Sequence, residues 1–315
     1  MKSRKIYVAL SQFCENDERP RKVLQEAGFI VEENKTGRRI KREEMLDALK
    51  EADAVLAAVE PYDAELLAQL PKLQCISRCG VGTDAIDLEV AKKYEKTVLV
   101  TADEIIEPVA QMTLAMILAL ARNFSLHAHD FKEALWKKHT GWLLSEWTIG
   151  LIGFGKIGRK VEEYLRPFGV CVLVCDPYLN KEKIPKGVTL CDLPTLLGKS
   201  DLVSLHLARD SKEGYLITAR EFAQMKKGSF FVNTARGYMV EEMALQAALK
   251  SGHLAGAALD VFEQEPYPGP LTKYSNVILT PHIATLTRAS RTAMELGCAQ
   301  NVVFFFKQIG EKDGL

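Results

Sequence analysis

The chain has 315 residues and a mass of 35.1 kDa, which is enough for two domains with separate cores. Hydrophobic residues make up 47% and charged residues 26%, and 41 basic side chains balance 41 acidic ones. This composition indicates a soluble globular protein, and it gives no reason to expect a nucleic acid or an anionic membrane as a partner.

The cysteines and the apolar segments indicate a cytoplasmic protein. Seven cysteines form an odd set without CxxC or zinc-ligand spacing, so we expect reduced thiols and no metal site. The N-terminal sequence MKSRKIYVALSQF has five apolar residues before polar ones return, which predicts a first strand and not a signal peptide. The longest apolar run, Val109 to Ala121, has 13 residues and is too short to cross a bilayer.

Strands and helices alternate along the first 100 residues. The expected strands cover residues 5–10, 29–32, 54–59, 73–77 and 97–100, and the expected helices cover 20–27, 42–52, 64–70 and 88–94. Alternation with short helices is typical of a parallel, doubly wound sheet. One α/β domain is therefore expected before residue 103.

Residues 103–147 interrupt this alternation. A long helix, expected from Val109 to Arg122, leads into a polar and aromatic stretch that contains Trp136 and Trp142, which we interpret as an arm joining two domains. Strands are then expected near residues 149, 171, 188, 202, 229, 255 and 277, with a helix from Glu241 to Ser251. The last helical segment, 287–307, has the length to return to the first domain. The fold class predicted is thus α/β, with two doubly wound Rossmann-like parallel-sheet domains, the first of them discontinuous.

The stretch from Thr148 to Asp176 contains the most informative motif. An apolar strand leads into Gly153, Gly155 and Gly158 in the spacing GxGxxG, and a helix and a second apolar strand follow. The first glycine permits a tight turn, the second lets a pyrophosphate approach the backbone, and the third lets the helix lie close to the strand. This complete layout predicts a dinucleotide site, with an ordinary glycine-rich turn as the alternative.

Asp176 ends the second strand of this motif, where its carboxylate can accept hydrogen bonds from the adenosine ribose. The same charge repels a 2′-phosphate, which favours NAD over NADP, although Lys181 and Lys183 follow closely.

Polar residues also follow three later strands. Arg236 lies in VNTARG, Asp260 and Glu265 lie in LDVFEQEP, and His282 lies in LTPHIA. Ligands of open α/β sheets bind at the carboxyl ends of the strands, so these residues are candidates for chemistry. Each alone is more often structural, and only their joint presence favours a catalytic role.

Together with SRCGVGTDAID (77–87), GLIGFGKIG and SDLVSLHL (200–207), these motifs resemble the NAD-dependent D-isomer-specific 2-hydroxyacid dehydrogenases, in the branch of D-3-phosphoglycerate dehydrogenase and glyoxylate/hydroxypyruvate reductase. The resemblance covers nearly the whole chain. It implies a substrate (catalytic) domain of residues 1–102 plus 285–315 and an NAD-binding domain of residues 103–284. It also implies a homodimer built through the nucleotide-binding domains and the arm at 103–147.

The resemblance implies a role for each site residue. Arg236 holds the carboxylate and carbonyl of a keto acid, His282 is the acid/base, and Glu265 fixes the tautomer of the histidine. The implied substrate-binding residues are Arg78, Cys79, Gly80, Val81 and Gly82, whose backbone N–H groups meet the substrate carboxylate. The implied cofactor-binding residues are Gly153, Gly155, Lys156, Ile157, Gly158, Asp176, His206, Leu207, Thr234, Ala235, Asp260 and Thr285.

Several alternatives stay open. Asp260 contacts the nicotinamide carboxamide or caps the loop that follows it, and His206 contacts the cofactor or only packs. The histidines of the arm, His127, His129 and His139, lack metal-ligand spacing and are expected to be solvated.

The substrate is expected to be of the 3-phosphoglycerate type, with glyoxylate or hydroxypyruvate as the alternative. Where phosphoglycerate dehydrogenases commonly have an arginine that helps to bind the substrate phosphate, the strand at 54–59 has Ala57, followed by Glu60 and Pro61. A nucleotide-sensing scaffold similar to the C-terminal binding protein corepressors is the alternative from another class.

Overall fold

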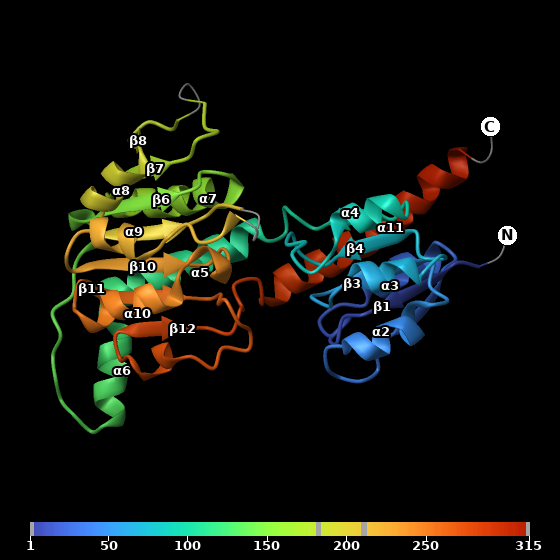
Figure 1. Cartoon of the computed structure of the whole chain (residues 1–315), viewed down its shortest axis with the longest axis horizontal. Helices are drawn as coiled ribbons and strands as arrows, with labels where there is room; N and C mark the ends of the chain where they lie inside the picture. Colours follow the sequence, from blue (N-terminus) through green and yellow to red (C-terminus); the bar gives the residue numbers. More distant parts are fainter. Residues whose placement is uncertain (1–2, 181–183, 209–212, 313–315) are drawn as a thin grey trace. The chain divides into compact units, whose positions relative to one another are not determined.

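The computed structural model describes residues 3–180, 184–208 and 213–312 (Figure 1). The chain divides into two compact units: the first comprises Met1–Ile105 and Leu286–Leu315, and the second comprises Ile106–Thr285. The expected boundaries, after residues 102 and 284, lie within a few residues of this division.

The first unit is built on a five-stranded parallel sheet in the order β2-β1-β3-β4-β5. Its strands are β1 (Lys5–Val8), β2 (Ile30–Glu33), β3 (Ala54–Ala57), β4 (Cys75–Arg78) and β5 (Thr97–Val100). Its helices are α1 (Arg19–Glu26), α2 (Arg42–Leu49), α3 (Ala64–Ala68), α4 (Leu88–Lys93) and α11 (Arg288–Lys312).

Helices cover both faces of this sheet. Residues of α2, α3 and α4 form one buried cluster with the sheet, to which Met45, Leu66 and Ala91 belong. The returning helix α11 packs on β4 and against α1. Ser77 and Cys298 join α11 to the sheet, because the Ser77 hydroxyl donates to the Cys298 carbonyl at 2.9 Å and the Cys298 thiol donates to the Ser77 carbonyl at 2.9 Å. The last helix is thus an integral part of the first unit.

The second unit is built on a seven-stranded parallel sheet in the order β12-β11-β10-β9-β6-β7-β8. Its strands are β6 (Thr148–Ile152), β7 (Cys171–Cys175), β8 (Val188–Leu190), β9 (Leu202–Leu205), β10 (Ser229–Asn233), β11 (Leu254–Leu259) and β12 (Val277–Leu279). Its α-helices are α5 (Ile106–Ala121), α6 (Phe124–Lys132), α7 (Lys156–Leu165), α8 (Leu193–Lys199), α9 (Ala219–Gln224) and α10 (Glu242–Lys250).

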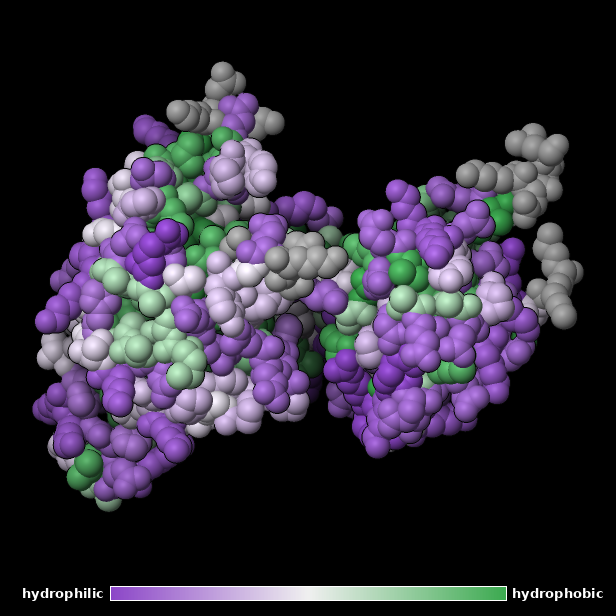
Figure 2. All heavy atoms as spheres, viewed as in Figure 1, coloured by the Kyte–Doolittle hydropathy of each residue, from purple (hydrophilic) through white to green (hydrophobic). Residues whose placement is uncertain are grey.

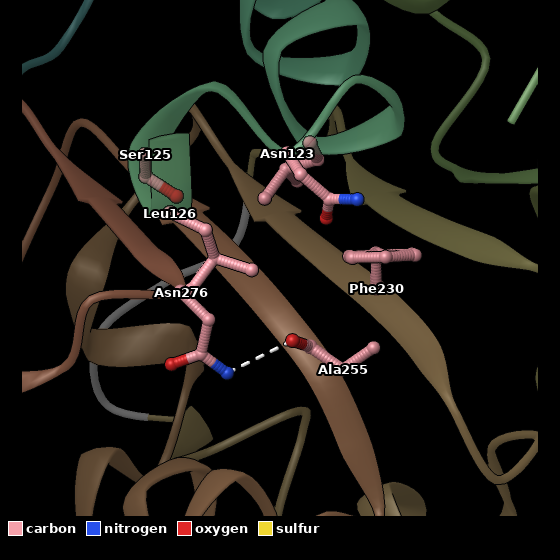
Figure 3. A pocket seen from close by; sticks show the side chains of 7 residues that line it. Asn123, Ser125, Leu126, Phe230, Ala255 and Asn276 are labelled. Carbon is pink, nitrogen blue, oxygen red and sulfur yellow. Dashed lines mark hydrogen bonds between the residues drawn. The ribbon is translucent and has the colours of Figure 1, made fainter. Parts of the chain in front are cut away.

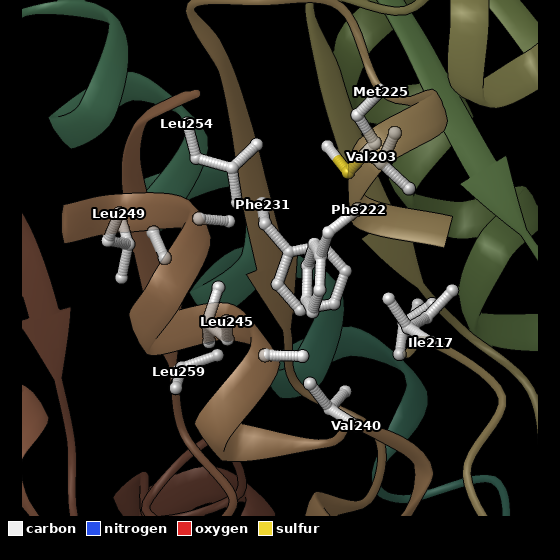
Figure 4. Close-up of a cluster of buried hydrophobic side chains, with 14 of the residues drawn as sticks. Val203, Ile217, Phe222, Met225, Phe231, Val240, Leu245, Leu249, Leu254 and Leu259 are labelled. Carbon is white, nitrogen blue, oxygen red and sulfur yellow. The ribbon is translucent and has the colours of Figure 1, made fainter. Parts of the chain in front are cut away.

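This sheet also has a core on each face. Apolar residues of α5 and α7 pack on one face. Residues of α8, α9 and α10 pack on the other, where the rings of Phe222 and Phe231 meet edge to face at 5.4 Å beside Leu245 (Figure 4). The predicted fold class, with two parallel doubly wound sheets, is confirmed.

The strand order locates the candidate site. The chain runs from β6 outward to β7 and β8, and then crosses back so that β9 pairs with the other edge of β6. A reversal of this kind separates the loops that follow β6 and β9 and leaves a crevice at the carboxyl ends of the strands. The GxGxxG turn follows β6 and therefore lies at this crevice.

The arm contains a helix that the sequence did not predict. Helix α6 follows Asn123, whose φ of 53° lies in the left-handed region. The structure corrects the expectation that the arm histidines are solvated: the His139 Nε2 lies 2.7 Å from the Asp130 carboxylate, and the rings of His127 and His139 meet edge to face at 5.1 Å. His129 remains exposed.

A small hollow lies where α6 meets the sheet, lined by residues that include Asn123, Leu126 and Phe230 (Figure 3). Its volume of about 10 Å³ is room for roughly one water molecule, so it is not a ligand site.

Polar residues cover most of the visible face of each unit (Figure 2). In the described part of the chain no single helix is long and apolar enough to cross a membrane, and α5 and α6 meet that criterion only as a pair bent by 65°. Helix α5 is largely buried in the second unit.

Candidate active site

The three glycines of the turn after β6 have distinct surroundings. Gly153 has a φ of +92°, and a Cβ there would lie 2.6 Å from the His206 carbonyl oxygen. A Cβ on Gly158 would lie 2.4 Å from the Gly153 carbonyl oxygen, so α7 could not approach the turn with any other residue. A Cβ on Gly155 would meet no atom within 4 Å. The turn is therefore tightly packed beneath and open above, at the start of α7, as the binding of a pyrophosphate requires.

A cavity of about 1010 Å³ extends from this turn along the carboxyl ends of the strands. Five of the predicted cofactor residues line it: Gly153, Gly155, Asp176, His206 and Leu207. Asp176 is fixed at its wall, because its two carboxylate oxygens accept hydrogen bonds from the backbone N–H groups of Phe154 and Tyr178 at 2.8 and 2.9 Å. The residues present thus fit a dinucleotide with a ribose at Asp176. Lys181 and Lys183 lie outside the described residues.

His206 is buried beneath the glycine turn. Its Nε2 and the Ser204 hydroxyl are 2.9 Å apart, and burial lowers the pKa of His206 from 6.5 to about 3. The imidazole is therefore neutral at physiological pH. His206 packs beneath the turn and also lines the cavity, and its contact with the cofactor stays a prediction.

The other predicted cofactor residues are not among those that line the cavity. Lys156 and Ile157 begin α7, next to the turn. The hydroxyl of Thr234 lies 2.9 Å from that of Thr113 and so connects the end of β10 to α5. Ala235 follows it in the same turn, and Thr285 is the last residue of the second unit.

The three predicted catalytic residues follow three neighbouring strands. Arg236 comes after β10, Glu265 after β11 and His282 after β12. His282 Nδ1 lies 2.8 Å from Glu265 Oε2, and Glu265 Oε1 accepts a hydrogen bond of 3.1 Å from the Phe262 N–H. The His282 side chain is 48% exposed, so its ring is both held by the carboxylate and accessible.

The charges of the three residues act on one another. Burial raises the pKa of Glu265, but the hydrogen bond and charge of His282, the Phe262 N–H and the charge of Arg236 together outweigh burial and leave this pKa below its usual value. Glu265 is therefore ionised at neutral pH, which favours a proton on the nitrogen of His282 that faces it. The guanidinium of Arg236 also donates to the Ala235 carbonyl at 2.7 Å.

Asp260 supports the loop that contains His282. Its carboxylate is completely buried, and it accepts hydrogen bonds from the Thr280 hydroxyl at 2.5 Å and from the N–H groups of Ile283 and Ala284 at 2.8 and 2.9 Å. These contacts correspond to the alternative interpretation of Asp260, a cap on the following loop, and contact with the cofactor stays a prediction. The loop needs such support, because His282 has a φ of 53°, which is strained for a residue other than glycine.

Two further residues, Asn233 and Gly237, shape this site and were not predicted from the sequence as site residues. The Asn233 side chain accepts a hydrogen bond from the Ala235 N–H at 3.0 Å and donates one to the Arg236 carbonyl at 2.9 Å. A Cβ on Gly237 would lie 1.9 Å from the Phe262 carbonyl carbon, so only glycine lets the Arg236 turn approach the Glu265 loop. An asparagine that ends a strand is a recognisable turn signal, whereas the need for Gly237 appears only in three dimensions.

The predicted substrate loop follows β4 in the first unit. The Cys79 N–H donates to the Ala57 carbonyl at 2.9 Å and the Gly80 N–H donates to the Thr101 hydroxyl at 2.7 Å. In the described part of the chain, the N–H groups of Val81 and Gly82 make no hydrogen bond. Of the predicted residues 79–82, Val81 and Gly82 are therefore the two whose N–H groups are available to a substrate carboxylate.

Arg78 is turned towards its own loop. Its guanidinium donates to the carbonyl oxygens of Cys79 and Gly82, the latter at 3.1 Å. Both carbonyl oxygens are thus occupied. Burial raises the pKa of the neighbouring Cys79 thiol to about 11, so this cysteine is an uncharged packing residue.

All seven cysteines are free, as expected. Within the described ranges, no group of three or more His, Cys, Asp or Glu side chains is arranged to hold a metal ion.

Comparison with known proteins identifies the relatives of the second unit and of the chain as a whole. Residues 114–284 match the family model described as the NAD-binding domain of D-isomer specific 2-hydroxyacid dehydrogenases. The chain is 39% identical over 277 residues to a glyoxylate reductase of Thermofilum pendens, covering 84% of this chain and 82% of that protein. It is 36% identical over 277 residues to a D-3-phosphoglycerate dehydrogenase of Archaeoglobus fulgidus, covering 86% of this chain but only 52% of that protein. The chain thus spans about half the length of the latter relative.

Solved structures agree with these matches. A glyoxylate reductase from Paecilomyes thermophila superimposes with a TM-score of 0.86 at 26% identity, covering 96% of this chain and 95% of that one. A D-lactate dehydrogenase from Aquifex aeolicus, solved with NAD and lactic acid, also gives a TM-score of 0.86, at 28% identity and with coverage of 98% and 96%.

Proposed function

Because the chain belongs to the D-isomer-specific 2-hydroxyacid dehydrogenase family, we propose that it reversibly reduces a small 2-keto acid to the D-2-hydroxy acid. It is an NAD-dependent oxidoreductase that acts on CH–OH groups. When bound, NADH supplies the hydride that the carbonyl carbon receives. The contact of 2.8 Å between Glu265 and His282, beside Arg236 at the ends of neighbouring strands, carries the proposal.

Arg236 binds the substrate in this proposal. A guanidinium presents a planar set of N–H donors, which match the carboxylate and carbonyl oxygens of a 2-keto acid. Its positive charge also stabilises the negative charge that develops on the carbonyl oxygen as hydride arrives.

His282 moves the proton. Because Nδ1 faces Glu265, Nε2 is the nitrogen that donates a proton to the developing alkoxide in reduction and accepts it in oxidation. The ionised Glu265 fixes the orientation of the ring. The N–H groups of Val81 and Gly82 receive the substrate carboxylate, since the other two N–H groups of that loop are already hydrogen-bonded.

We propose 3-phosphoglycerate-type substrates first, and glyoxylate or hydroxypyruvate as the alternative. The relatives include both kinds of enzyme, and the more complete match is to a glyoxylate reductase. Steady-state assays with NADH and a panel of 2-keto acids that includes 3-phosphohydroxypyruvate, hydroxypyruvate and glyoxylate distinguish the two. Absence of turnover on every acid, with NADH binding confirmed, contradicts the enzymatic proposal.

Replacing His282 tests the proposed acid/base. His282→Ala is expected to remove most of the turnover and to leave NADH affinity nearly unchanged, because the side chain acts on the substrate proton and not on the dinucleotide. Initial rates and a fluorescence titration with NADH measure the two effects. His129→Ala, at an exposed position of the arm, is the control and should retain activity. Equal loss of turnover and NADH affinity in His282→Ala means that the residue is structural.

A nucleotide-sensing scaffold remains the alternative from another class. The C-terminal binding protein corepressors resemble the same family and also retain residues like Arg236, Glu265 and His282. Catalytic turnover favours the enzyme. NAD-dependent binding of a protein partner, without turnover, favours the scaffold.

We further propose a cytoplasmic homodimer, supported by the free cysteines and by the exposed aromatic side chains of the arm.

A further inference from the structure

The loop from Val261 to Pro266 sets the position of the proposed Glu265–His282 pair. Val261 and Phe262 are buried, Glu265 accepts the Phe262 N–H, and the Phe262 ring stacks on Tyr267 with centroids 4.4 Å apart. On its other side the loop approaches Gly237 so closely that no side chain fits between them. Glu263, between Phe262 and Glu265, is exposed, so a contact from outside the loop is what holds its backbone.

Glu242 provides one such contact. Its Oε1 accepts a hydrogen bond of 2.9 Å from the Glu263 N–H, although the two residues are 21 positions apart. Glu242 is the first residue of α10, directly after the turn that contains Arg236 and Gly237. The Glu263 side chain itself is exposed. The backbone of the residue two positions before Glu265 is thus held by the Glu242 carboxylate.

The position of Glu242 is electrostatically unfavourable. Burial raises the pKa of Glu242, and the nearby Glu263 charge raises it further, while the Glu263 N–H only partly opposes both effects. Tyr215 and Tyr267, the other titratable groups beside it, supply no positive charge. A carboxylate that served only to begin α10 could extend into water instead. Glu241, its neighbour, contacts a different segment, because its Oε2 accepts the Ala219 N–H at 3.2 Å.

We propose that Glu242 is a positioning residue for the Glu265–His282 pair, acting through the backbone of Glu263. The inference rests on the proposed function. Glu242 touches neither substrate nor cofactor in this proposal. It holds the loop so that the Glu265 carboxylate stays within hydrogen-bond distance of His282 Nδ1, and it thereby supports the orientation of the ring that transfers the proton.

Three variants test the proposal. Glu242→Leu removes the acceptor, Glu242→Gln retains an oxygen that can accept the Glu263 N–H, and Glu241→Leu makes the same change one residue earlier. We expect Glu242→Leu to lower kcat between about tenfold and a hundredfold, as a small misplacement of a catalytic group does. Its NADH affinity should stay within twofold of wild type, on the order of error in such titrations. Glu242→Gln should regain most of the rate.

The pH profile separates positioning from a general loss of structure. If Glu265 no longer faces His282 correctly, the titration that limits kcat/KM should move in Glu242→Leu and stay in place in Glu241→Leu. A wild-type rate and profile in Glu242→Leu, or an equal loss in Glu241→Leu, overturns the proposal.

Hydrogen exchange provides a readout that is independent of turnover. Amides of residues 260–265 should exchange faster in Glu242→Leu than in wild type or Glu241→Leu, while those of the β10 and β11 strands remain protected. Unchanged exchange overturns the positioning role. The two proposals can fail separately. If the wild type reduces no keto acid but exchange is faster in Glu242→Leu, the loop contact is established and only the proposed function is contradicted.

Discussion

Two histidines of the second unit, His206 and His282, have opposite surroundings. His206 is 8% exposed and its pKa is lowered by burial to about 3, whereas the His282 side chain is 48% exposed and faces an ionised carboxylate. Burial without a counter-charge keeps an imidazole neutral, whereas the Glu265 carboxylate holds the accessible ring of His282 in one orientation. The same residue type therefore serves as a neutral packing group in one place and as the proposed proton carrier in the other.

The buried histidine makes stability depend on pH. Between about pH 3 and 6.5 the unfolded chain binds a proton at His206 and the folded chain does not, so stability falls as pH decreases below 6.5. The slope from one such group is at most about 1.4 kcal/mol per pH unit. In His206→Gln the side chain at this position cannot titrate. The free energy of unfolding of this variant should therefore depend less steeply on pH than that of wild type between about pH 5 and pH 7.

Urea denaturation across this range measures the effect. His129→Gln, in the exposed part of the arm, should keep the wild-type slope. Parallel pH dependences for wild type and His206→Gln contradict the prediction.

Residue types at strand ends could be predicted from the sequence, but their orientation could not. The motifs identified Asp260 and His282 as candidates, and periodicity put both at the ends of strands. Whether Asp260 faces the cavity or the interior depends on residues 280–284, which lie 20 to 24 positions later and follow another strand. That geometry arises only when β11 and β12 are paired.

At the scale of elements, the turn between β6 and α7 combines positions that need glycine for different reasons. At Gly158 a methyl group would collide with the backbone, whereas at Gly155 it would project into the open region above the turn. The first position serves the packing of α7 on the turn, and the second serves the ligand.

Alanine substitutions should separate these two effects. Gly155→Ala is expected to fold with nearly wild-type stability and to weaken NADH binding by about tenfold or more, since a loss of 1.4 kcal/mol suffices for that factor. Gly158→Ala is expected to lower the free energy of unfolding by about 1–3 kcal/mol, because α7 must move away from the turn. Fluorescence titration with NADH and thermal unfolding measure the two properties. If Gly155→Ala binds NADH normally, the turn does not receive the pyrophosphate.

The strands were predictable, and two of the short helices were not. The expected strand positions of the second sheet agree with the observed strands to within a few residues, because most of these parallel strands are buried and apolar. Helices α8 and α9, with 7 and 6 residues, were not predicted. Their starts were encoded all the same, since the Asp192 side chain caps α8 and Thr218 with Glu221 forms a capping box on α9.

At the scale of the whole molecule, we propose that the arm forms part of the homodimer interface. Phe131 and Trp136 are 61% and 80% exposed, and their rings meet edge to face at 5.5 Å. Exposed large aromatic side chains that are grouped together are frequent anchors of protein interfaces. The two-sheet architecture could be predicted from the alternation of strands and helices. The dimer interface could not be predicted in this way, because contact with a second copy produces no periodic pattern in the sequence.

Removing one anchor should weaken the dimer. Trp136→Ser is expected to raise the dimer dissociation constant by at least about tenfold, because an interface tryptophan commonly contributes 2 kcal/mol or more. Light scattering after size-exclusion chromatography, over a range of protein concentrations, measures this constant. Phe304→Ser, which alters an exposed aromatic residue of α11 outside the arm, is the matched control. A wild type that is monomeric at every concentration, or equal weakening by both variants, contradicts the proposed interface.

The contact between Ser77 and Cys298 spans 221 residues and has a consequence for biosynthesis. Translation adds about 5–20 residues per second, so β4 emerges from the ribosome roughly ten seconds or more before α11 exists. The second unit is continuous in sequence and has all of its chain earlier. The core of the first unit therefore stays incomplete until the residues of α11 have been made, whereas the second unit needs no later segment.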